Sequence, residues 1–371
     1  MLFRSSDAMR TMLIGLRPGA DPARDADAME RVMAFAQGLP FPEAELLAAR
    51  QLISDDPPRH DVLRMLVNRG FTPRRIAEWE PRMQAIVDEC LRGLRDGADF
   101  DVVADLGIPL PVRIIAEMLG VEPERRADFK HWSDAVISGT TGLGRRVDPV
   151  ASGFVPAMRA LGEYITGVVA ARRATPGDDL VSLLVAAQDG EAGLTAAEVM
   201  CFVTLLLVAG NETTTNLIGN ATNALLRHPA QLARVRADRS LLPSLVEESL
   251  RWDAPAQLVF RRTTRGVEVG GQHVPADRHV IVLLGSANRD ERQWGPTAAD
   301  FDVARNPQGH LAFGFGTHFC LGAALARLEA RVALRALVDE LPRLERRDPR
   351  TEWVDSFLVR GPRRLALRRA A

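Results

Sequence analysis

The stretch Phe313–Gly322 reads FGFGTHFCLG and brings three glycines, a histidine and a cysteine close together. Apolar residues then recur at steps of three or four from Leu325 to Leu341, which predicts a long helix. Cys320 therefore lies where a glycine-rich loop enters a helix, and the N–H groups and partial positive charge of a helix N-terminus favour a thiolate. The glycines allow the backbone to approach a large, flat partner. We expect an accessible, stabilised thiolate beneath such a partner.

Composition limits the kind of protein. The chain has 371 residues, is 46% hydrophobic and carries a net charge of −1, so it can bury a large core but has no strong field for nucleic acid or a membrane surface. Three cysteines in a chain of this length do not form a disulfide framework, which favours a reducing, cytoplasmic setting. The most apolar run, Met200–Gly210, is too short to span a bilayer. We expect a soluble protein.

The segment DPPRHDVLR, residues 56–64, places His60 and Arg64 four residues apart on a predicted helix. Residues at this spacing share one helix face. Two interpretations remain open: an exposed helix with basic residues, or a clamp for a carboxylate or phosphate.

A second long helix is predicted from the capping box Thr195–Glu198 to Arg227, where His228–Pro229 stops it. Its middle, Ala209–Thr215 (AGNETTT), contains weak helix formers whose hydroxyls compete with the backbone ladder. We expect a bulge there that holds polar groups and water; the alternative is a kink with internally satisfied hydroxyls. Burial of Glu212 is costly unless this carboxyl is paired or used.

The remaining elements follow in order. Helical patterns cover the first 55 residues, at Ser6–Leu16, Asp25–Gln37 and Phe41–Ile53, and residues 138–144 (SGTTGLG) form a candidate lid loop. Glu248 and Arg251 lie three apart on a short helix and can pair. Short strands are predicted at Val267–Val269 and Val280–Leu284, irregular coil over Ser286–Arg292 and Trp294–Gly309, and a terminal hairpin turning near Arg360–Pro362.

The order of these motifs resembles the cytochrome P450 family of haem-thiolate monooxygenases. The cysteine loop matches the family pattern F-x-x-G-x-H-x-C-x-G, Glu248–Arg251 matches E-x-x-R, and Ala209–Thr213 matches A-G-x-[DE]-T. Asp56–Arg64, Arg261 and Ala287–Asp290 fall in the expected order. The resemblance covers nearly all of residues 1–371 as one domain. It implies a mainly α fold, a helical bundle around haem with a small β-rich subdomain, whose N-terminal part is shortened here.

The resemblance also implies roles for single residues. Cys320 would be the axial ligand of the iron of haem b, and His60, Arg64, Arg261 and His318 would pair with the haem propionates. The expected cofactor-binding set is His60, Arg64, Ala209, Arg261, Phe313, Gly314, His318, Cys320 and Gly322. Thr213 would donate a hydrogen bond on the oxygen-binding side and Glu212 would deliver protons through water, whereas Glu248 and Arg251 would be structural.

Substrate-pocket candidates are mostly apolar, which favours a hydrophobic small molecule. They are Leu205, Val208, Ala209, Gln257, Leu258, Val259 and Leu358. The resemblance implies hydroxylation or epoxidation with O2 as co-substrate, in secondary metabolism, by a monomer that receives electrons from a ferredoxin or flavodoxin and its reductase. Arg327 and Arg331 are candidate contacts for that acidic partner, or solvated helix faces.

Other interpretations are less well supported by the residues. A zinc site lacks third and fourth ligands near Cys320 and His318, and a Cys/His hydrolase lacks an evident orienting residue. A peroxide-driven haem-thiolate enzyme usually replaces the acid–alcohol pair, which is present here as Glu212 and Thr213. A non-catalytic relative that acts as a partner or activator protein tends to lose the cysteine or the distal residues, which this chain keeps.

Overall fold

The structure is a computed structural model that describes residues 3–5, 40, 41, 45, 49, 51–141, 153–186 and 194–370. The helices predicted at Ser6–Leu16 and Asp25–Gln37 lie outside the described residues, as does most of the one at Phe41–Ile53. The candidate lid at 138–144 begins inside helix α9 (Arg126–Thr141), and its remainder is not described.

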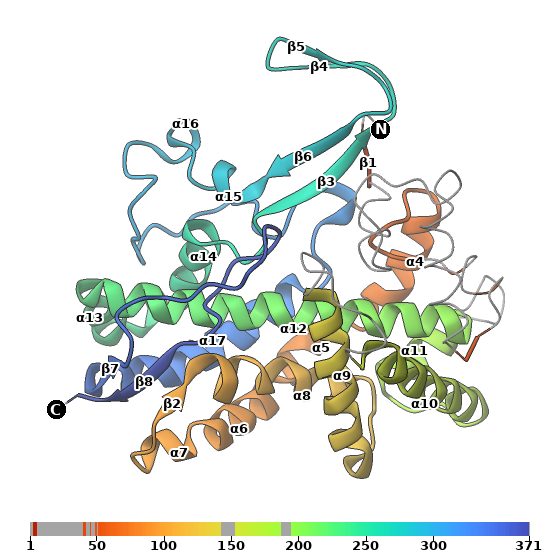
Figure 1. Ribbon diagram of the computed structural model, residues 1–371, viewed down its shortest axis with the longest axis horizontal. Coiled ribbons are helices and arrows are strands. Elements are labelled where there is room, and N and C mark those ends of the chain that lie inside the picture. Colours follow the sequence, from red (N-terminus) through yellow and green to blue (C-terminus); the bar gives the residue numbers. More distant parts are fainter. Residues whose placement is uncertain are drawn as a thin grey trace. The chain divides into compact units, whose positions relative to one another are not determined.

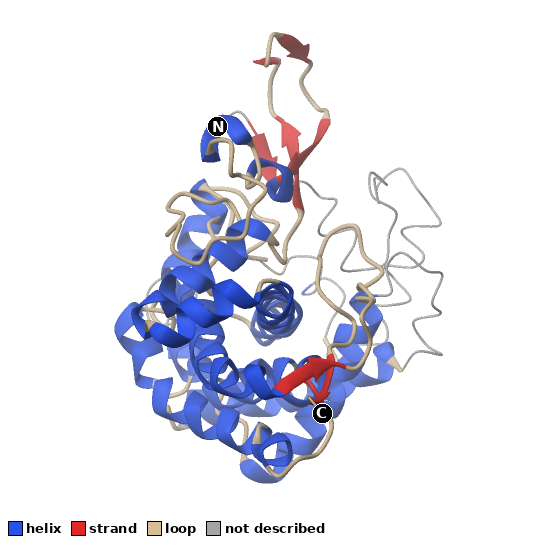
Figure 2. Cartoon of the chain, turned by 90° about the vertical axis from the view of Figure 1, so that its left-hand side faces the viewer, coloured by secondary structure: helices blue, strands red, loops and turns tan. Residues whose placement is uncertain are grey.

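The described chain is mainly helical with a few short strands, as the sequence predicts (Figure 2). The helices besides α9 are α4 (Arg59–Asn68), α5 (Pro73–Glu78), α6 (Glu80–Cys90), α7 (Arg92–Arg95), α8 (Pro109–Met118), α10 (Phe154–Ala174), α11 (Leu180–Val185), α12 (Ala196–Arg227), α13 (Pro229–Ala237), α14 (Leu242–Trp252), α15 (Leu284–Ala287), α16 (Glu291–Trp294) and α17 (Ala323–Glu340). Shorter 3-10 or π turns are η1 (Val102–Gly107), η2 (Pro123–Arg125), η5 (Arg239–Leu241), η6 (Gly316–His318) and η7 (Leu341–Arg343).

The strands form three small sheets. Their bounds are β1 (Phe3–Ser5), β2 (Phe100–Asp101), β3 (Leu258–Thr263), β4 (Val267–Val269), β5 (Gln272–Val274), β6 (His279–Leu283), β7 (Leu344–Arg346) and β8 (Ala366–Arg369). The sheet orders are β1-β3-β6, β2-β8-β7 and β4-β5. The β4–β5 hairpin projects beyond β3 and β6 (Figure 1). The strands predicted at Val267–Val269 and Val280–Leu284 are thus confirmed as β4 and β6.

The described chain divides into two compact units, each assembled from three separate segments. Unit 1 contains residues 1–70, 115–208 and 260–282, and unit 2 contains residues 71–114, 209–259 and 283–371. Helix α12 passes from one to the other between Val208 and Ala209. The expectation of a single domain stays a prediction.

Helix α12 begins with the predicted capping box. The backbone N–H of Thr195 donates to Glu198 Oε2 (2.9 Å), and the backbone N–H of Glu198 donates to Thr195 Oγ1 (3.2 Å), so two N–H groups at the helix start are satisfied. The predicted bulge is absent, because α12 stays helical throughout and Thr213 Oγ1 donates to the carbonyl of Ala209 (2.6 Å). This i to i−4 bond satisfies the hydroxyl without opening the backbone ladder.

Length and hydropathy alone would let α12 cross a membrane, and it is the one helix among the described residues that meets this test. The prediction that no apolar run is long enough to span a bilayer considered the stretch Met200–Gly210 alone. It did not include the threonine-containing part of the helix that follows this stretch. A buried core helix passes the same test. In the second half of α12, every residue from Thr214 to Leu225 is buried.

Helix α17 forms the core of unit 2. The apolar positions predicted from the sequence, among them Leu325, Leu328, Val332 and Leu337, are buried. This face packs against α5, α6, α13 and α14. The amphipathic stripe therefore fixes how the helix that follows the cysteine loop is held.

Two loop predictions need correction. Ser286–Arg292 is not wholly irregular, because α15 ends and α16 begins within it, with Asp290 accepting a hydrogen bond from the backbone N–H of Arg292 (2.9 Å) as a helix cap. The terminal hairpin turns between Val354 and Gly361, whose N–H and carbonyl pair at 2.9 Å, rather than near Arg360–Pro362. The coil predicted over Trp294–Gly309 is irregular from residue 295 onward, whereas Trp294 itself is the last residue of α16.

Candidate functional site

The cysteine loop closes on itself through backbone hydrogen bonds. The N–H of Cys320 donates to the carbonyl of Phe313 (2.9 Å), and the N–H of Phe319 donates to the carbonyl of Gly316 (2.9 Å). Gly314 (φ +71°) and Gly316 (φ +78°) hold the left-handed conformation that this tight loop needs. Cys320 is half-buried and lies just before α17, whose cap is Gly322, so the predicted place of the thiol at a helix N-terminus is confirmed.

One feature of the loop fits a large planar cofactor. A Cβ built on Gly316 or Gly322 would meet no atom within 4 Å, and one on Gly314 would meet only the carbonyl oxygen of His318, at 3.9 Å. A half-buried thiol with open glycines on both sides is a suitable donor for the iron of a haem. The residues present therefore fit haem.

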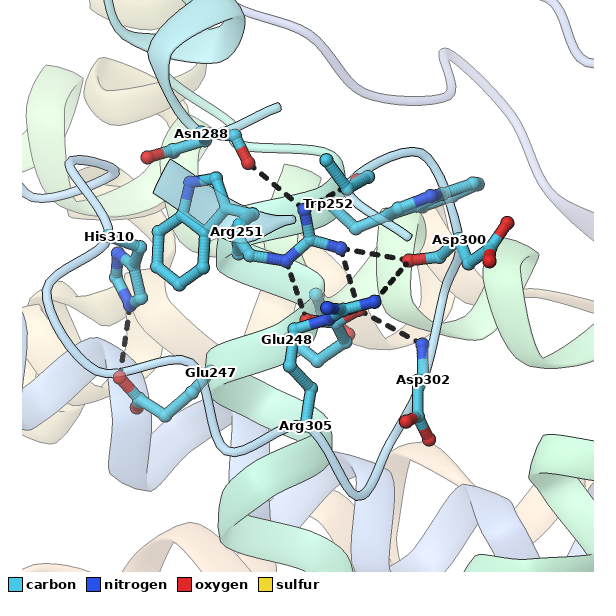
Figure 3. A network of polar contacts seen from close by, with 12 residues as sticks. Glu247, Glu248, Arg251, Trp252, Asn288, Asp300, Asp302, Arg305 and His310 are labelled. Atoms are coloured by element: carbon cyan, nitrogen blue, oxygen red, sulfur yellow. Dashed lines mark hydrogen bonds and ion pairs between the residues drawn. The ribbon is translucent and has the colours of Figure 1, made fainter. Parts of the chain in front are cut away.

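The Glu248–Arg251 pair is fully buried and anchors the coil that leads to the cysteine loop (Figure 3). Arg251 contacts both Glu248 oxygens at 2.7 Å. The guanidinium also donates to the carbonyls of Asn288, Ala298 and Asp300 at 3.0, 2.7 and 2.9 Å. The pair thus ties α14 to the coil after Trp294, which fits the structural role that the resemblance implies for it.

Arg305 completes this network, and sequence reasoning missed it. Its Nε atom lies 3.3 Å from Glu248 Oε1, and its Nη2 atom donates to the carbonyl of Thr297 (2.8 Å). Glu248 thereby compensates two guanidinium groups. A single arginine within a polar coil gives no periodic signal, so only the folded coil reveals the contact.

Helix α12 carries the predicted catalytic pair. Ala209 is exposed, Glu212 and Thr213 are partly exposed, and Leu205 and Val208 are partly exposed at helical spacing from them. Burial without a compensating charge raises the pKa of Glu212 to about 7. This carboxyl can therefore exist in both protonation states near neutral pH.

A second carboxyl near this part of α12 was not predicted. Glu329 of α17 is buried and forms a hydrogen bond with Thr214. Burial raises the pKa of Glu329 to about 8, although the hydrogen bond acts in the opposite direction. Its Oε1 atom has no hydrogen-bond partner in the described part of the chain. The sequence placed Glu329 among the helix-forming residues of α17, with no motif to set it apart.

Three of the four predicted propionate partners belong to unit 1. His60 is buried on α4 with Nδ1 3.1 Å from Asp61, and Arg64 donates from Nε to Asn68 Oδ1 (3.0 Å). Burial lowers the pKa of Arg261 on β3, while the charge of Asp56 raises it. The fourth, His318, lies in η6 of the cysteine loop in unit 2.

The structure brings together two predicted segments of the substrate pocket. The N–H of Gln257 donates to the carbonyl of Leu358 (2.9 Å). The side chain of Gln257 donates to the carbonyl of Ala254 (2.6 Å), so this amide is used within its own turn. Leu258 is buried, whereas Val259 and Leu358 are partly exposed.

The two arginines predicted as candidate partner contacts are engaged within unit 2. Arg327 pairs with Glu247 through Nε (2.7 Å) and Nη2 (2.9 Å), and Arg331 pairs with Glu80 (3.0 Å). Each guanidinium is therefore compensated by a carboxylate of another helix. This arrangement weakens the argument for either one as a contact for an acidic protein.

Comparison with known proteins shows the family of the chain. Residues 149–359 match the family model for Cytochrome P450. Cytochrome P450 107B1 of Saccharopolyspora erythraea is 40% identical over 98% of this chain and 87% of its own length, and 6-deoxyerythronolide B hydroxylase of the same organism is 39% identical over 98% and 88%. The solved structure of cytochrome P450 CYP109Q5 from Chondromyces apiculatus has a TM-score of 0.80 and 41% identity, and the match covers 100% of this chain and 89% of that one.

The chain therefore belongs to the cytochrome P450 family. It has the fold of that family and is a cytochrome P450 monooxygenase, an enzyme that uses haem and O2.

Proposed function

We propose that this monooxygenase inserts one oxygen atom into a mostly hydrophobic small molecule as a tailoring step of secondary metabolism. The observation that carries the proposal is the half-buried Cys320 between open glycines at the start of α17. The enzyme is a soluble, cytoplasmic monomer that receives electrons from a ferredoxin or flavodoxin and its reductase. Membranes and nucleic acids are not partners.

The proposed cofactor is haem b, with the Cys320 thiolate as axial ligand. When bound, haem with a thiolate ligand supplies the electron donation that favours cleavage of the O–O bond. Phe313 keeps water from the sulfur, Gly314 and Gly322 allow close approach of the backbone, and His318 donates to a propionate. His60, Arg64 and Arg261 supply the remaining charge for the propionates, and Ala209 presents a small side chain to the haem.

Glu212 and Thr213 manage protons in this proposal. A carboxyl with a pKa of about 7 exchanges protons readily at neutral pH, which suits a general acid that is recharged through water. The Thr213 hydroxyl donates to Ala209 but keeps oxygen lone pairs that can accept a hydrogen bond from water. Together they can hold a water and pass a proton along α12.

The substrate is expected to contact Leu205, Val208 and Ala209 of α12, Gln257–Val259 and Leu358. An apolar lining with a few polar groups suits a hydrophobic molecule. One relative is named 6-deoxyerythronolide B hydroxylase and another Cyclomarin C epoxidase, which supports hydroxylation or epoxidation as the reaction. The paired Glu212 and Thr213 argue against a peroxide-driven enzyme, and together with Cys320 they argue against a non-catalytic activator.

The test is spectroscopic. Reduced, carbon-monoxide-bound protein should show the Soret band typical of thiolate-ligated haem, and Cys320→Ser should lose it. An imidazole-type band, or a thiolate band that survives in Cys320→Ser, contradicts the assignment. Titration of a compound library against the Soret band then finds the substrate class, because a ligand that displaces water shifts the spin state.

Coupling of electron use to product formation tests the proton relay. Thr213→Ala should release peroxide while product falls, since the hydroxyl that helps hold the water is lost. Oxygen consumption, peroxide and product are measured together with a surrogate ferredoxin system. Unchanged coupling would place the relay elsewhere.

A further inference from the structure

Glu247 and Glu248 are consecutive on α14 but contact different partners. Figure 3 shows Glu248 against Arg251 and Arg305, whereas Glu247 meets His310. Glu247 Oε2 lies 3.0 Å from His310 Nε2, and both carboxylate oxygens accept hydrogen bonds from Arg327 at 2.7 and 2.9 Å. A bidentate carboxylate–guanidinium pair fixes orientation as well as distance. No motif of the sequence assigned a role to Glu247.

The partners of Glu247 act on residues that directly precede the glycine loop. His310 Nδ1 accepts the backbone N–H of Ala312 (3.2 Å), so Nε2 carries the proton that is donated to Glu247. The guanidinium of Arg327 lies 4.5 Å from the centre of the Phe313 ring. One step earlier, Asn288 Oδ1 accepts the N–H of Leu311 (2.7 Å). Three consecutive residues are therefore each held by a side chain.

Phe313 transmits this restraint to Cys320. Its carbonyl accepts the N–H of Cys320 (2.9 Å), and its ring packs edge-on against Phe319 at 6.3 Å between ring centres. A displacement of Phe313 would therefore move the backbone N–H of Cys320 and the ring of Phe319, the residue that precedes Cys320.

The charges of Glu247 and Arg327 compensate each other. His310 and Glu247 are largely buried, with 3% and 16% of their side chains exposed. Burial alone would raise the pKa of Glu247, but hydrogen bonds from His310 and Arg327 and the charge of Arg327 hold it at about 2. Glu247 is therefore ionised at any working pH and compensates Arg327.

We propose that Glu247 is a positioning residue for the thiolate loop: it fixes Phe313 through Arg327 and His310, and it neutralises the Arg327 charge beside the Phe313 ring. This inference rests on the proposed haem ligation by Cys320. Loss of Glu247 leaves the Arg327 charge uncompensated beside Phe313, whose carbonyl accepts the N–H of Cys320, and an uncompensated positive charge on this loop raises the reduction potential of the iron. Loss of Arg327 leaves a negative charge and acts in the opposite direction.

The experiment measures the iron reduction potential of the haem-loaded protein and the share of thiolate-type and thiol-type bands in its reduced carbon monoxide complex. Glu247→Gln, which keeps the shape but removes the charge, should shift the potential upward. Arg327→Gln should shift it downward. Arg327→Lys keeps the charge but loses the fork, so its potential should stay near that of the wild type while conversion to the thiol form becomes several-fold faster.

Glu80→Gln is the matched control. Glu80 on α6 pairs with Arg331 and Arg335 of the same helix α17 at 3.0 and 3.2 Å, and its side chain is 33% exposed against 16% for Glu247. Its substitution breaks an ion pair to α17 without removing a partner of Arg327 or His310. The potential and the thiolate share should stay at wild-type values.

Three results overturn the inference: no shift in either charge variant, shifts of the same sign in both, or an equal shift in Glu80→Gln. If Glu247→Gln takes up no haem, the sign of the Arg327→Gln shift and the conversion rate of Arg327→Lys decide. A wild-type protein without a thiolate band contradicts the proposed function itself, which separates that failure from this one.

Discussion

At the scale of single residues, two carboxyl groups on neighbouring helices lie in surroundings that favour the protonated form. Glu212 on α12 and Glu329 on α17 both have raised pKa values because they are buried. Only Glu212 lies in the motif proposed for proton transfer. Both carboxyl groups are therefore expected to lower stability, but only the one at Glu212 should do so in return for a function.

Glu212→Gln should raise stability and lower activity. The pKa of Glu212 rises from an ordinary value of 4.5 to about 7 on folding, so its contribution to stability is complete below pH 4.5 and is lost as pH rises through 7. The loss amounts to about 3 kcal/mol at most. Urea unfolding should show Glu212→Gln above the wild type at pH 8 and level with it near pH 4.5, while product formation falls about 10²-fold or more. An equally active variant contradicts the proton-transfer role.

Glu329→Gln should raise stability over a wider range. The pKa of Glu329 rises to about 8, so the wild type loses stability from pH 4.5 until about pH 8. At neutral pH the variant should be more stable by about 3 kcal/mol. Chemical unfolding at a series of pH values measures this gain. A gain that does not change with pH would show that Glu329 is ionised in the folded protein.

At the scale of elements, α14 anchors both the coil after Trp294 and the cysteine loop. Besides Glu248, Arg251 reaches the carbonyls of Ala298 and Asp300 in that coil and the carbonyl of Asn288 at the end of α15, with none of its side chain exposed. A buried ion pair adds little by itself, but removal of one partner leaves an uncompensated charge. The coil is therefore expected to lose its fixed structure when Arg251 is replaced.

Arg251→Met should cost about 3–5 kcal/mol, because Glu248 remains buried and keeps only its weaker contacts, with Arg305 and with the backbone N–H of Asp302. Soluble yield, haem content and thermal unfolding measure the loss. Arg292→Met is the control, since Arg292 pairs with Asp290 on the surface with 90% of its side chain exposed. It should unfold like the wild type, because a solvent-exposed ion pair adds little to stability. Equal effects in both variants would contradict the anchoring role of Arg251.

The sequence predicted those parts of the site that depend on local spacing. The capping box of α12, the Glu248–Arg251 pair and the stripe of α17 all follow from residues three or four apart, a distance set by helix geometry. The contacts of Arg305, of Glu329 with Thr214 and of Glu247 with His310 and Arg327 join residues far apart in the chain. No periodicity marks such contacts. The prediction of a bulge in α12 was wrong because the Thr213 hydroxyl donates to a carbonyl of its own helix, and the helix continues without a break.

At the scale of the whole molecule, the order of motifs was more informative than any one of them. A glycine loop with a cysteine, or an E-x-x-R pair, occurs in many chains, whereas their succession from residue 56 to residue 322 led to the family that the comparisons show. The composition shows that the chain carries no large net charge, but it gives no indication of the cofactor.

Removal of haem tests whether the cofactor is part of the fold. A ligand that binds only the native state stabilises it by about 4 kcal/mol when its concentration is 1,000 times its Kd. Extracted apoprotein should therefore melt well below the holoprotein, and added haem should restore both the melting temperature and the thiolate band. Cys320→Ser should recover less of the difference, since it keeps the contacts of the porphyrin but loses the bond to iron. Equal melting temperatures with and without haem would mean that the polypeptide alone holds the fold, and that the thiolate loop is preformed by side chains such as Arg251, Glu247 and Arg327.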